Sequence, residues 1–322
     1  AYKMVLSSDL LRDDKQLDLF FASLDVKKRY LLALSGGSDS LFLFYLLKER
    51  GVSFTAVHID HGWRSTSAQE AKELEELCAR EGVPFVLYTL TAEEQGDKDL
   101  ENQARKKRYA FLYESYRQLD AGGIFLAHHA NDQAETVLKR LLESAHLTNL
   151  KAMAERSYVE DVLLLRPLLH IPKSSLKEAL DARGISYLQD PSNEDERYLR
   201  ARMRKKLFPW LEEVFGKNIT FPLLTLGEES AELSEYLEKQ AQPFFSAATH
   251  QDSQGELPCP DCLIQQAFLC KWVMKKFFNN AGIAVSRHFL QMVYDHLSRS
   301  SCATLRMRNK IVIIKPGVVV ID

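Results

Sequence analysis

The chain has 322 residues, of which 46% are hydrophobic and 27% are charged, so it is long enough to bury the cores of two domains. Its 42 basic and 44 acidic residues give a formal net charge of −2, which excludes a uniformly basic protein and requires a local basic patch for any polyanionic partner. The chain has no apolar run approaching the ~18 residues of a membrane span and no secretory signal pattern, so we expect a cytoplasmic protein without membrane contact.

The first predicted strand, residues 30–34, leads through a turn rich in glycine and serine into a predicted helix over residues 38–50. The turn consists of Ser35, Gly36, Gly37, Ser38, Asp39 and Ser40. Glycine lets backbone N–H groups approach an anion, and the N-terminus of the next helix favours negative charge. The turn has neither a Walker lysine nor a G-x-G-x-x-G pattern, so we expect another kind of phosphate loop, with Asp39 holding Mg²⁺. The alternative is a turn that only caps a buried helix.

Strands and helices alternate along the next 90 or so residues. Apolar runs predict strands at residues 54–59, 85–90 and 124–127, and polar segments predict helices at residues 67–81 and 99–119. The first of these two helices begins Ser67-Ala68-Gln69-Glu70, a capping-box pattern, and Gly82 marks its end. This alternation predicts an α/β fold with a parallel sheet flanked by helices, which binds ligands at the carboxyl ends of its strands.

Polar residues occur at the end of the second predicted strand, where His58 and Asp60 would face the same crevice as the glycine-rich turn. A nucleotide base fits that position. A ring packed in the core is the alternative for His58, and the residue alone favours it.

The stretch LAHHANDQAETVLK from Leu126 leaves the fourth predicted strand with His128 and His129, and Asn131 or Asp132 can start the next helix. Asp132 and Glu135 stand three residues apart and share a helix face, an arrangement that favours a cation. First-turn acids that stabilise the helix dipole explain the pattern equally well.

Residues 197–206 contain six basic residues and no acid. Arg200 and Arg204 would face one way, and Arg202 and Lys206 another. In a chain of net negative charge this concentration predicts contact with a polyanion, with a solvated helix face as the alternative.

The composition changes after residue 215, which divides the chain into an expected catalytic domain, 1–215, and a second domain, 216–322. Helical patterning predicts a mainly helical second domain that ends in a small β hairpin around Asn309 and Pro316-Gly317. Its basic residues predict RNA contact, although a solvated face explains them nearly as well. These are Lys271, Lys275, Lys276 and Arg287.

The five cysteines are an odd number scattered over the chain, which indicates reduced thiols. Cys259 and Cys262 have the spacing of half a zinc site, but no second pair follows, so a proline-containing turn is the favoured interpretation.

Several stretches together resemble one branch of the PP-loop ATP pyrophosphatases, which split ATP into AMP and PPi. The turn from Ser35 to Ser40 resembles the PP-loop itself. Four further stretches are HIDHGWRSTSAQEA from His58, ENQARKKRYAFL from Glu101, LAHHANDQAETVLKRL from Leu126 and DPSNEDERYLRARMRKKLFP from Asp190, and RPLLHIPK from Arg166 is also similar. They are similar to the tRNA(Ile)-lysidine synthetases over about residues 28–210. The resemblance implies the adenine nucleotide α-hydrolase-like variant of the Rossmann fold.

The resemblance also implies a reaction and its partners. An enzyme of this family ligates L-lysine to C2 of the wobble cytidine of tRNA(Ile) with a CAU anticodon, through an adenylylated cytidine. It would use ATP and Mg²⁺ and release AMP and PPi. A homodimer is compatible with the sequence, which leaves the oligomeric state open.

Site residues follow from the matched motifs. Catalytic roles are implied for Asp39, Arg105, His128, Asp132, Glu135, Arg202 and Arg204. Binding of the nucleotide is implied for Ser35, Gly36, Gly37, Ser38, Asp39, Ser40, His58 and Asp60, and Asp39 alone is expected to hold the metal. The base that deprotonates lysine is left open among His128, Asp132 and Glu135. Asp99 and Ala201 stand where asparagine is usual, and residues 143–150 lack the usual glycines.

Three alternatives share part of this pattern. A tRNA thiolase has the same loop but passes sulfur, and Cys78 is the only cysteine before residue 250. A non-enzymatic RNA-binding protein would not need Asp39 or the His/Asp/Glu set. A small-molecule synthetase of the superfamily would not need the basic helix.

Overall fold

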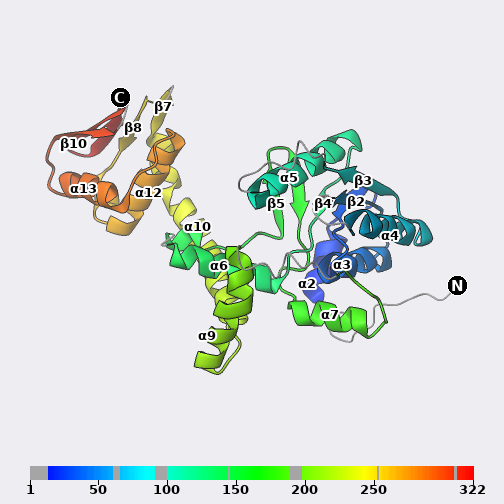
Figure 1. The fold of residues 1–322 in the computed structure, drawn as a ribbon. Helices are drawn as coiled ribbons and strands as arrows, with labels where there is room; N and C mark the ends of the chain where they lie inside the picture. The colour runs from blue at the N-terminus through cyan, green and yellow to red at the C-terminus, as the bar shows by residue number, and fades with distance from the viewer. Residues whose placement is uncertain are drawn as a thin grey trace. The chain divides into compact units, whose positions relative to one another are not determined.

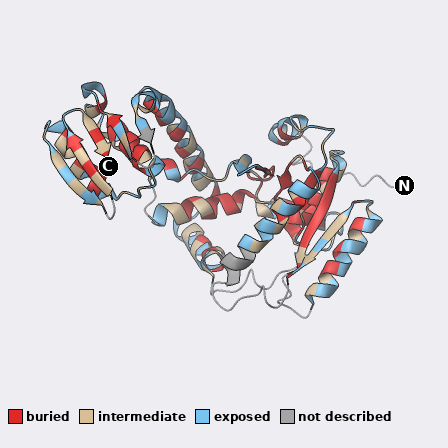
Figure 2. Ribbon diagram, turned by 90° about the horizontal axis from the view of Figure 1, so that it is seen from above, coloured by how far each residue is buried: buried red, intermediate tan, exposed pale blue. Residues whose placement is uncertain are grey.

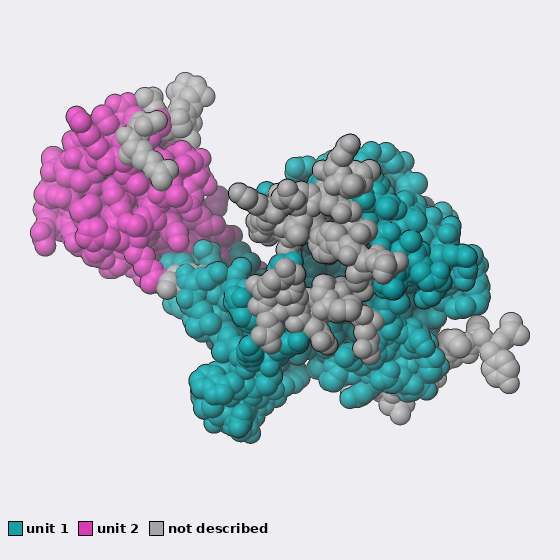
Figure 3. All heavy atoms as spheres, in the orientation of Figure 1, with its two compact units in different colours: residues 1–229 teal, residues 230–322 magenta. Residues whose placement is uncertain are grey.

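The computed structural model describes residues 14–60, 66–90, 100–143, 146–188, 198–251, 254–307 and 310–322, with side chains throughout these ranges except at residues 100–105, 250, 251 and 254. The chain forms two compact units, residues 1–229 and 230–322, which Figure 3 shows in two colours. Each unit has its own hydrophobic core.

The first unit is built on a six-stranded sheet with strand order β3-β2-β1-β4-β6-β5 (Figure 1). Its strands are β1 (Tyr30–Ala33), β2 (Phe54–Asp60), β3 (Phe85–Thr89), β4 (Ile124–Phe125), β5 (Arg156–Val159) and β6 (Val162–Leu165). Strands β3, β2, β1, β4 and β6 are parallel, whereas β5 pairs antiparallel with β6. The predicted α/β fold with a parallel sheet is therefore confirmed, and the β5–β6 hairpin is an addition at one edge.

Strand order changes direction beside β1. The chain runs outward from β1 to β2 and β3 on one side, and then returns to β4 on the other, where Leu31 pairs with Ile124 and Leu32 with Phe125. The carboxyl ends of β1 and β4 are therefore neighbours at a topological switch point, where open α/β sheets bind ligands.

Helices cover both faces of this sheet. They are α2 (Lys15–Ala22), α3 (Ser38–Glu49), α4 (Ser67–Arg80), α5 (Leu100–Gln118) and α7 (Lys173–Asp181), whereas α6 (Ala130–Leu142) follows β4 and packs away from the sheet on residues 203–219. One core cluster joins α2, α3, α4 and α7 to the sheet, and another packs α5 on residues such as Leu31 and Val57. Because α3 is covered by the sheet and by α7, its residues 41–47 are apolar nearly all round. The inner strands β2, β1, β4 and β6 are largely buried, and Figure 2 shows buried strands at the centre of this unit.

The predicted capping box at Ser67 is wrong. The N-cap of α4 is Thr66, which is in a helical conformation, and its hydroxyl donates to Glu70 Oε1 at 2.9 Å instead of capping the backbone. The predicted end is confirmed, because Gly82 follows the helix with a φ of +68° that favours glycine.

The basic stretch forms α8 (Leu199–Arg202) and one turn of π-helix, η4 (Met203–Leu207), which continue into α9 (Phe208–Phe215). Met203 and Phe208 pack in a small cluster with Ala134 and Leu138 of α6. This packing fixes the basic stretch beside α6. Gly216, with a φ of +62°, ends α9 at the predicted change of composition.

The second unit combines helices with a five-stranded antiparallel sheet of order β7-β8-β11-β10-β9. Its strands are β7 (Thr249–Gln251), β8 (Gln254–Pro258), β9 (Ala303–Met307), β10 (Lys310–Lys315) and β11 (Val318–Ile321). Its helices are the later part of α10 (Thr220–Ala247), α11 (Asp261–Ile264), α12 (Ala267–Asn280) and α13 (Arg287–Ser298). The predicted mainly helical unit with a terminal hairpin is confirmed, and β7 and β8 extend the hairpin into a small sheet.

Cys259 follows β8 directly and is buried, Pro260 is the N-cap of α11, and exposed Cys262 lies in the first turn of that helix. In the described ranges, no helix is both long and apolar enough to cross a bilayer.

Candidate active site

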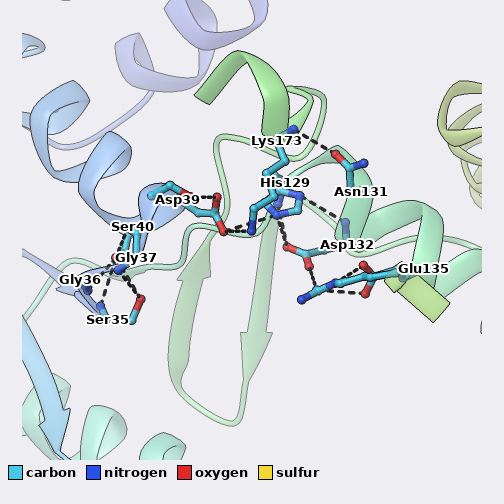
Figure 4. A network of polar contacts seen from close by, with 12 residues as sticks. Ser35, Gly36, Gly37, Asp39, Ser40, His129, Asn131, Asp132, Glu135 and Lys173 are labelled. Carbon is cyan, nitrogen blue, oxygen red and sulfur yellow. Dashed lines mark hydrogen bonds and ion pairs between the residues drawn. The ribbon is translucent and has the colours of Figure 1, made fainter. Parts of the chain in front are cut away.

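The turn after β1 is closed by the Ser40 side chain, as Figure 4 shows. Ser40 Oγ accepts hydrogen bonds from the backbone N–H groups of Ser35 at 3.2 Å and Gly36 at 3.1 Å, and it donates to the carbonyl of Gly37 at 3.1 Å. These bonds hold the chain in the sharp bend that Gly36 makes with a φ of +83°.

The N-terminus of α3 has no side-chain cap. Its N-cap is Gly37, which has no side chain to cap the first turn. The N–H groups of Ser38, Asp39 and Ser40 occupy the positions that have no partner within a helix, and they lie at its positive end. This terminus can therefore bind an anion, as the sequence predicted.

His58 lies in β2 and is buried, and its Nδ1 donates to the carbonyl of Leu34 at 2.8 Å. Its ring stacks near Phe85, and burial lowers the pKa of His58 below its ordinary value. The side chain thus fixes the residue that precedes the glycine-rich turn. Asp60 is buried at the end of the same strand. Contact of either residue with a nucleotide stays a prediction.

Asp39 is the centre of the polar network in Figure 4. Its Oδ2 lies 3.0 Å from Lys173 Nζ and 3.5 Å from His129 Nε2, and its Oδ1 accepts from Ser38 Oγ at 3.0 Å. Burial opposes ionisation, but the bonds and charges of His129 and Lys173 outweigh it and hold the pKa of Asp39 well below its ordinary value. The carboxylate is therefore ionised throughout the neutral range.

The N-cap of α6 is His129, so the prediction that Asn131 or Asp132 starts this helix is wrong. His129 Nδ1 accepts from the Asp132 N–H at 3.4 Å, and Asp132 Oδ2 accepts from the His129 N–H at 3.1 Å, which completes a capping box. The other ring nitrogen of His129, Nε2, lies 3.5 Å from Oδ2 of Asp39 and 3.5 Å from Oδ2 of Asp132. The structure therefore joins the two carboxylates through His129, whereas His128 is only half-buried beside them.

Asp132 and Glu135 share one partner, Arg204. Its Nη2 donates to Asp132 Oδ1 at 2.8 Å and to Glu135 Oε2 at 3.1 Å, and its Nε donates to the other oxygen of Glu135. The charges of His129, His128 and Arg204 outweigh burial and lower the pKa of Asp132, whereas burial outweighs Arg204 and raises the pKa of Glu135. The two carboxylates thus differ in basicity.

The other predicted arginines are less closely involved. Arg200 is near enough to favour the ionised form of Glu135, whereas Arg202 is exposed. The Arg105 side chain and Arg197 lie outside the described part of the chain. Catalytic roles for Arg105 and Arg202 stay predictions. Ala201, one of the departures from the family pattern, is buried.

Sequence reasoning missed two members of the network, His129 and Lys173. Lys173 is the first residue of α7, and its backbone N–H donates to Asn131 Oδ1 at 3.0 Å. His129 belongs to the paired histidines, and Lys173 ends the RPLLHIPK stretch. The signal for His129 was an aspartate three residues later, the spacing of a capping box.

Comparisons with known proteins place the chain in one family. The PP-loop domain family matches residues 10–211. The tRNA(Ile)-lysidine synthase of Chlamydia felis is 60% identical over 315 residues, which cover 98% of this chain and 99% of that protein. The tRNA(Ile)-lysidine synthase of Chlamydia abortus is 59% identical over the same shares.

A solved structure is similar in fold. The U34-tRNA thiolase NcsA from Methanococcus maripaludis, with its [4Fe-4S] cluster, has a TM-score of 0.56 and 16% identity, and the match covers 68% of this chain and 76% of that one. At this identity the likeness shows the fold alone.

Proposed function

Because the chain belongs to the family of tRNA(Ile)-lysidine synthases, we propose that the carboxyl ends of β1 and β4 bring together ATP, lysine and the wobble cytidine of tRNA(Ile). The chain is an ATP-dependent enzyme that forms lysidine on tRNA(Ile). The observation that carries the assignment of the site is the continuous network from the glycine-rich turn through Asp39 and His129 to Asp132 and Glu135.

The first step activates the base. The C2 oxygen of cytidine is a poor leaving group, so it attacks the α phosphorus of ATP and PPi departs. The uncapped N-terminus of α3 binds the phosphates, because its N–H groups and dipole favour negative charge. Adenylylation makes AMP the leaving group of the second step.

The residues present fit Mg²⁺. This ion is commonly held by one or two carboxylates together with substrate phosphates, and the ionised Asp39 lies in the first turn of the phosphate-binding helix. No group of three or more His, Cys, Asp or Glu side chains in the described residues is placed to hold a metal alone, so substrate oxygens would complete the site. When bound, the ion supplies charge neutralisation to the reacting phosphates.

The second step needs an uncharged amine. The ε-ammonium of lysine has an ordinary pKa of about 10.4 and must lose a proton before it attacks C2. Asp132 and Glu135 form the negative pair that binds this ammonium, in competition with Arg204. Since burial raises the pKa of Glu135 and the pKa of Asp132 is lowered, Glu135 is the stronger base and accepts the proton.

Sulfur transfer, the chemistry of the thiolases with this fold, finds no support in the same region. Cys78 is fully buried in α4, and burial raises its pKa to about 12. The reactive species in sulfur chemistry is the thiolate. Cys78 is therefore not available for it.

The assignment is tested with purified protein, ATP, radiolabelled lysine and a tRNA(Ile) transcript with a CAU anticodon. We expect label in the tRNA at the wobble base, and none when ATP is omitted. The matched control is the same transcript with uridine at the wobble position, which offers the enzyme no cytidine to modify. Equal labelling of both transcripts, or no labelling of either, would contradict the proposal.

A further inference from the structure

Exposed apolar and aromatic side chains gather on α9, directly after the basic stretch. Phe208 is the one buried residue of this helix, and it packs with Leu211 in the cluster that holds the basic stretch beside α6. Trp210, Val214 and Phe215 are 58%, 59% and 62% exposed. Figure 1 shows α9 extending away from the sheet of its unit. Packing within the protein therefore explains the inner face of α9 but not its outer face, which we define by Trp210 and Val214.

The outer face of α9 continues a positively charged side of the basic stretch. Trp210 and Val214 are four residues apart and so lie on one side of the helix. Lys205 and Lys206, about one turn earlier, are exposed, and so is Lys217 just after the helix. Lysines beside an exposed aromatic ring are typical of surfaces that bind single-stranded nucleic acid, because the lysines attract phosphates and the ring stacks on a base.

The charge of this region agrees with a nucleic-acid partner. Residues 202–217 contain five basic and two acidic side chains. One of the two acids, Glu212, accepts from the Ile219 N–H at 3.4 Å, and Ile219 belongs to the packed cluster on the inner side. The excess of positive charge therefore lies on the exposed side.

The outer face is also close to the active site. Arg204, which donates to Asp132, precedes Trp210 by six residues in one continuous helical segment. At a rise of about 1.5 Å per residue, the two positions are at most roughly 9 Å apart along the helix axis. Because Arg204 is turned toward α6 and Trp210 is exposed, the ring is placed for a nucleotide beside the reacting cytidine and not for the cytidine itself.

We propose that Trp210 stacks on an unpaired base of the anticodon loop next to the wobble cytidine, while Lys205 and Lys206 contact the neighbouring phosphates. The inference rests on the proposed function, because it takes the wobble cytidine to lie at the network around Arg204. Trp210 holds the loop in place and takes no part in proton or phosphoryl transfer.

A second copy of the chain is the other partner that an apolar helix face can bind. In a symmetric dimer the same surface patch of both copies meets itself. A pair of α9 helices would then bring the lysines of both copies together, and like charges at a contact oppose association. The lysines and the tRNA substrate therefore favour RNA as the occupant of this face.

The test compares Trp210→Ala with Trp210→Phe, which keeps an aromatic ring, and with Tyr158→Ala, which removes a 71% exposed ring from β5. Filter binding over a range of salt concentrations measures the affinity for tRNA(Ile) with a CAU anticodon. We expect Trp210→Ala to weaken binding roughly 5-fold to 100-fold, the range for one lost base–aromatic stack. The slope of log K against log salt should not change, because no charge is removed. Trp210→Phe should recover most of the affinity, and Tyr158→Ala should bind like the wild type.

A double-mutant cycle tests the contact with the base directly. Two further tRNA(Ile) molecules carry an abasic nucleotide, one on the 5′ side and the other on the 3′ side of the wobble cytidine. If Trp210 stacks on one of these bases, its removal from the RNA should weaken binding to the wild-type protein but not to Trp210→Ala. Thermal unfolding checks that each variant folds.

Three results would overturn the inference: wild-type affinity in folded Trp210→Ala, a phenylalanine variant no better than the alanine one, or abasic nucleotides that weaken both proteins equally. Sedimentation of the wild type as a dimer that Trp210→Ala dissociates would also overturn it and assign the outer face of α9 to a second copy. Failure of the wild-type protein to incorporate lysine into tRNA(Ile) would instead overturn the proposed function.

Discussion

At the scale of single residues, Gly36 and Gly37 are adjacent but have different constraints. Gly36 has a φ of +83°, and a Cβ added to it would lie 2.6 Å from Leu188 Cδ1. Gly37 has an ordinary φ of −73°, and the nearest atom to an added Cβ would be 3.7 Å away. The fold therefore requires glycine at the first position, whereas at the second only a ligand can require it.

Gly36→Ala and Gly37→Ala should consequently separate stability from binding. We expect Gly36→Ala to lower the unfolding free energy by about 1–3 kcal/mol, because alanine is strained at this φ and meets Leu188. Gly37→Ala should unfold within a few degrees of the wild type but bind ATP more weakly, since its methyl group stands at the helix terminus that we propose binds the phosphates. Thermal unfolding and ATP titration measure the two effects. Wild-type ATP affinity in folded Gly37→Ala would mean that the phosphates do not approach this backbone.

Much of the candidate site could be predicted from the sequence, but two of its residues, His129 and Lys173, could not. Asp39, Asp132, Glu135 and Arg204 were predicted, and the structure places them in one network. His129 was passed over for His128 because the choice between neighbours depends on where α6 begins. Lys173 lies 134 residues from Asp39, and no local pattern links the two. The contact exists only because α3 and α7 pack together.

At the scale of elements, the basic stretch divides its side chains between a packed side beside α6 and an exposed side. Arg204 points to the carboxylates of α6, and Met203 and Phe208 pack beside that helix. Arg202, Lys205 and Lys206 are exposed. The π-helical turn η4 contains Arg204, in keeping with the frequent occurrence of such turns at functional sites.

Substitutions of the exposed lysines and of the partly buried Arg204 should therefore have different effects. We expect Lys205→Ala and Lys206→Ala to weaken tRNA binding and each to reduce the slope of log K against log salt by about 0.7, the value for a lost phosphate contact in a single strand. Arg204→Ala should abolish turnover even at saturating tRNA while leaving that slope intact. Filter binding over a range of salt concentrations, with kcat measured in parallel, tests both. Unchanged slopes in the lysine variants would show a solvated helix face.

Helix α2 provides a test of stability against pH. Asp14 caps it by accepting from the N–H groups of Gln16 and Leu17, each at 3.0 Å, and it also pairs with His170. Burial opposes ionisation, but these bonds outweigh it and lower the folded-state pKa of Asp14 below the ordinary value of 3.8. The ionised form therefore stabilises the fold above pH 3.8, and this contribution is lost as the pH falls through the folded-state pKa.

Asp14→Ala should thus lower the free energy of unfolding by about 1 kcal/mol at neutral pH. The difference in unfolding free energy between this variant and the wild type should become smaller as the pH falls through the folded-state pKa of Asp14. Urea unfolding at a series of pH values measures this. Asp14→Asn keeps a capping oxygen without the charge, so its free energy of unfolding at neutral pH should lie between those of Asp14→Ala and the wild type. A gap that widens at low pH would contradict the role assigned to the carboxylate.

Element types were predictable where the pattern was long, and boundaries were less so. Helices α3, α4 and α5 and strands β1, β2 and β3 fall close to the predicted ranges, whereas α2 and α7 were not predicted. Strand β4 is only Ile124–Phe125, because residues 126–129 leave the sheet toward the start of α6. The short strands β5, β6, β7 and β8 were not predicted, since runs of three to five residues give no clear period.

At the scale of the whole molecule, strand order creates the active site, and the sequence does not contain that order in any local form. Alternation of strands and helices predicts a parallel sheet, but not that β4 returns to pair with β1. This pairing brings the ends of two distant segments together and sets Asp39 beside His129. Topology therefore completes the chemistry that the motifs indicate.

The second unit has a complete core of its own, with residues such as Trp272, Phe277 and Val319 fully or almost fully buried. Its contact with tRNA stays a prediction. Two of the basic residues on which this prediction rests have partners within the unit. Lys271 donates to Gln291, and Lys276 forms an ion pair with Glu238. These contacts favour the solvated-face interpretation for those two positions.

The measurement that tests the central claim most directly is the product balance of the reaction with α-labelled ATP, lysine and tRNA(Ile). If the glycine-rich turn splits ATP at the α phosphate to activate the cytidine, one AMP should form for each lysidine, and the same amount of PPi should be released. Omitting lysine should stop lysidine formation without producing ADP. ADP as the principal nucleotide product, or lysidine formed without matching AMP, would contradict the assignment of this site.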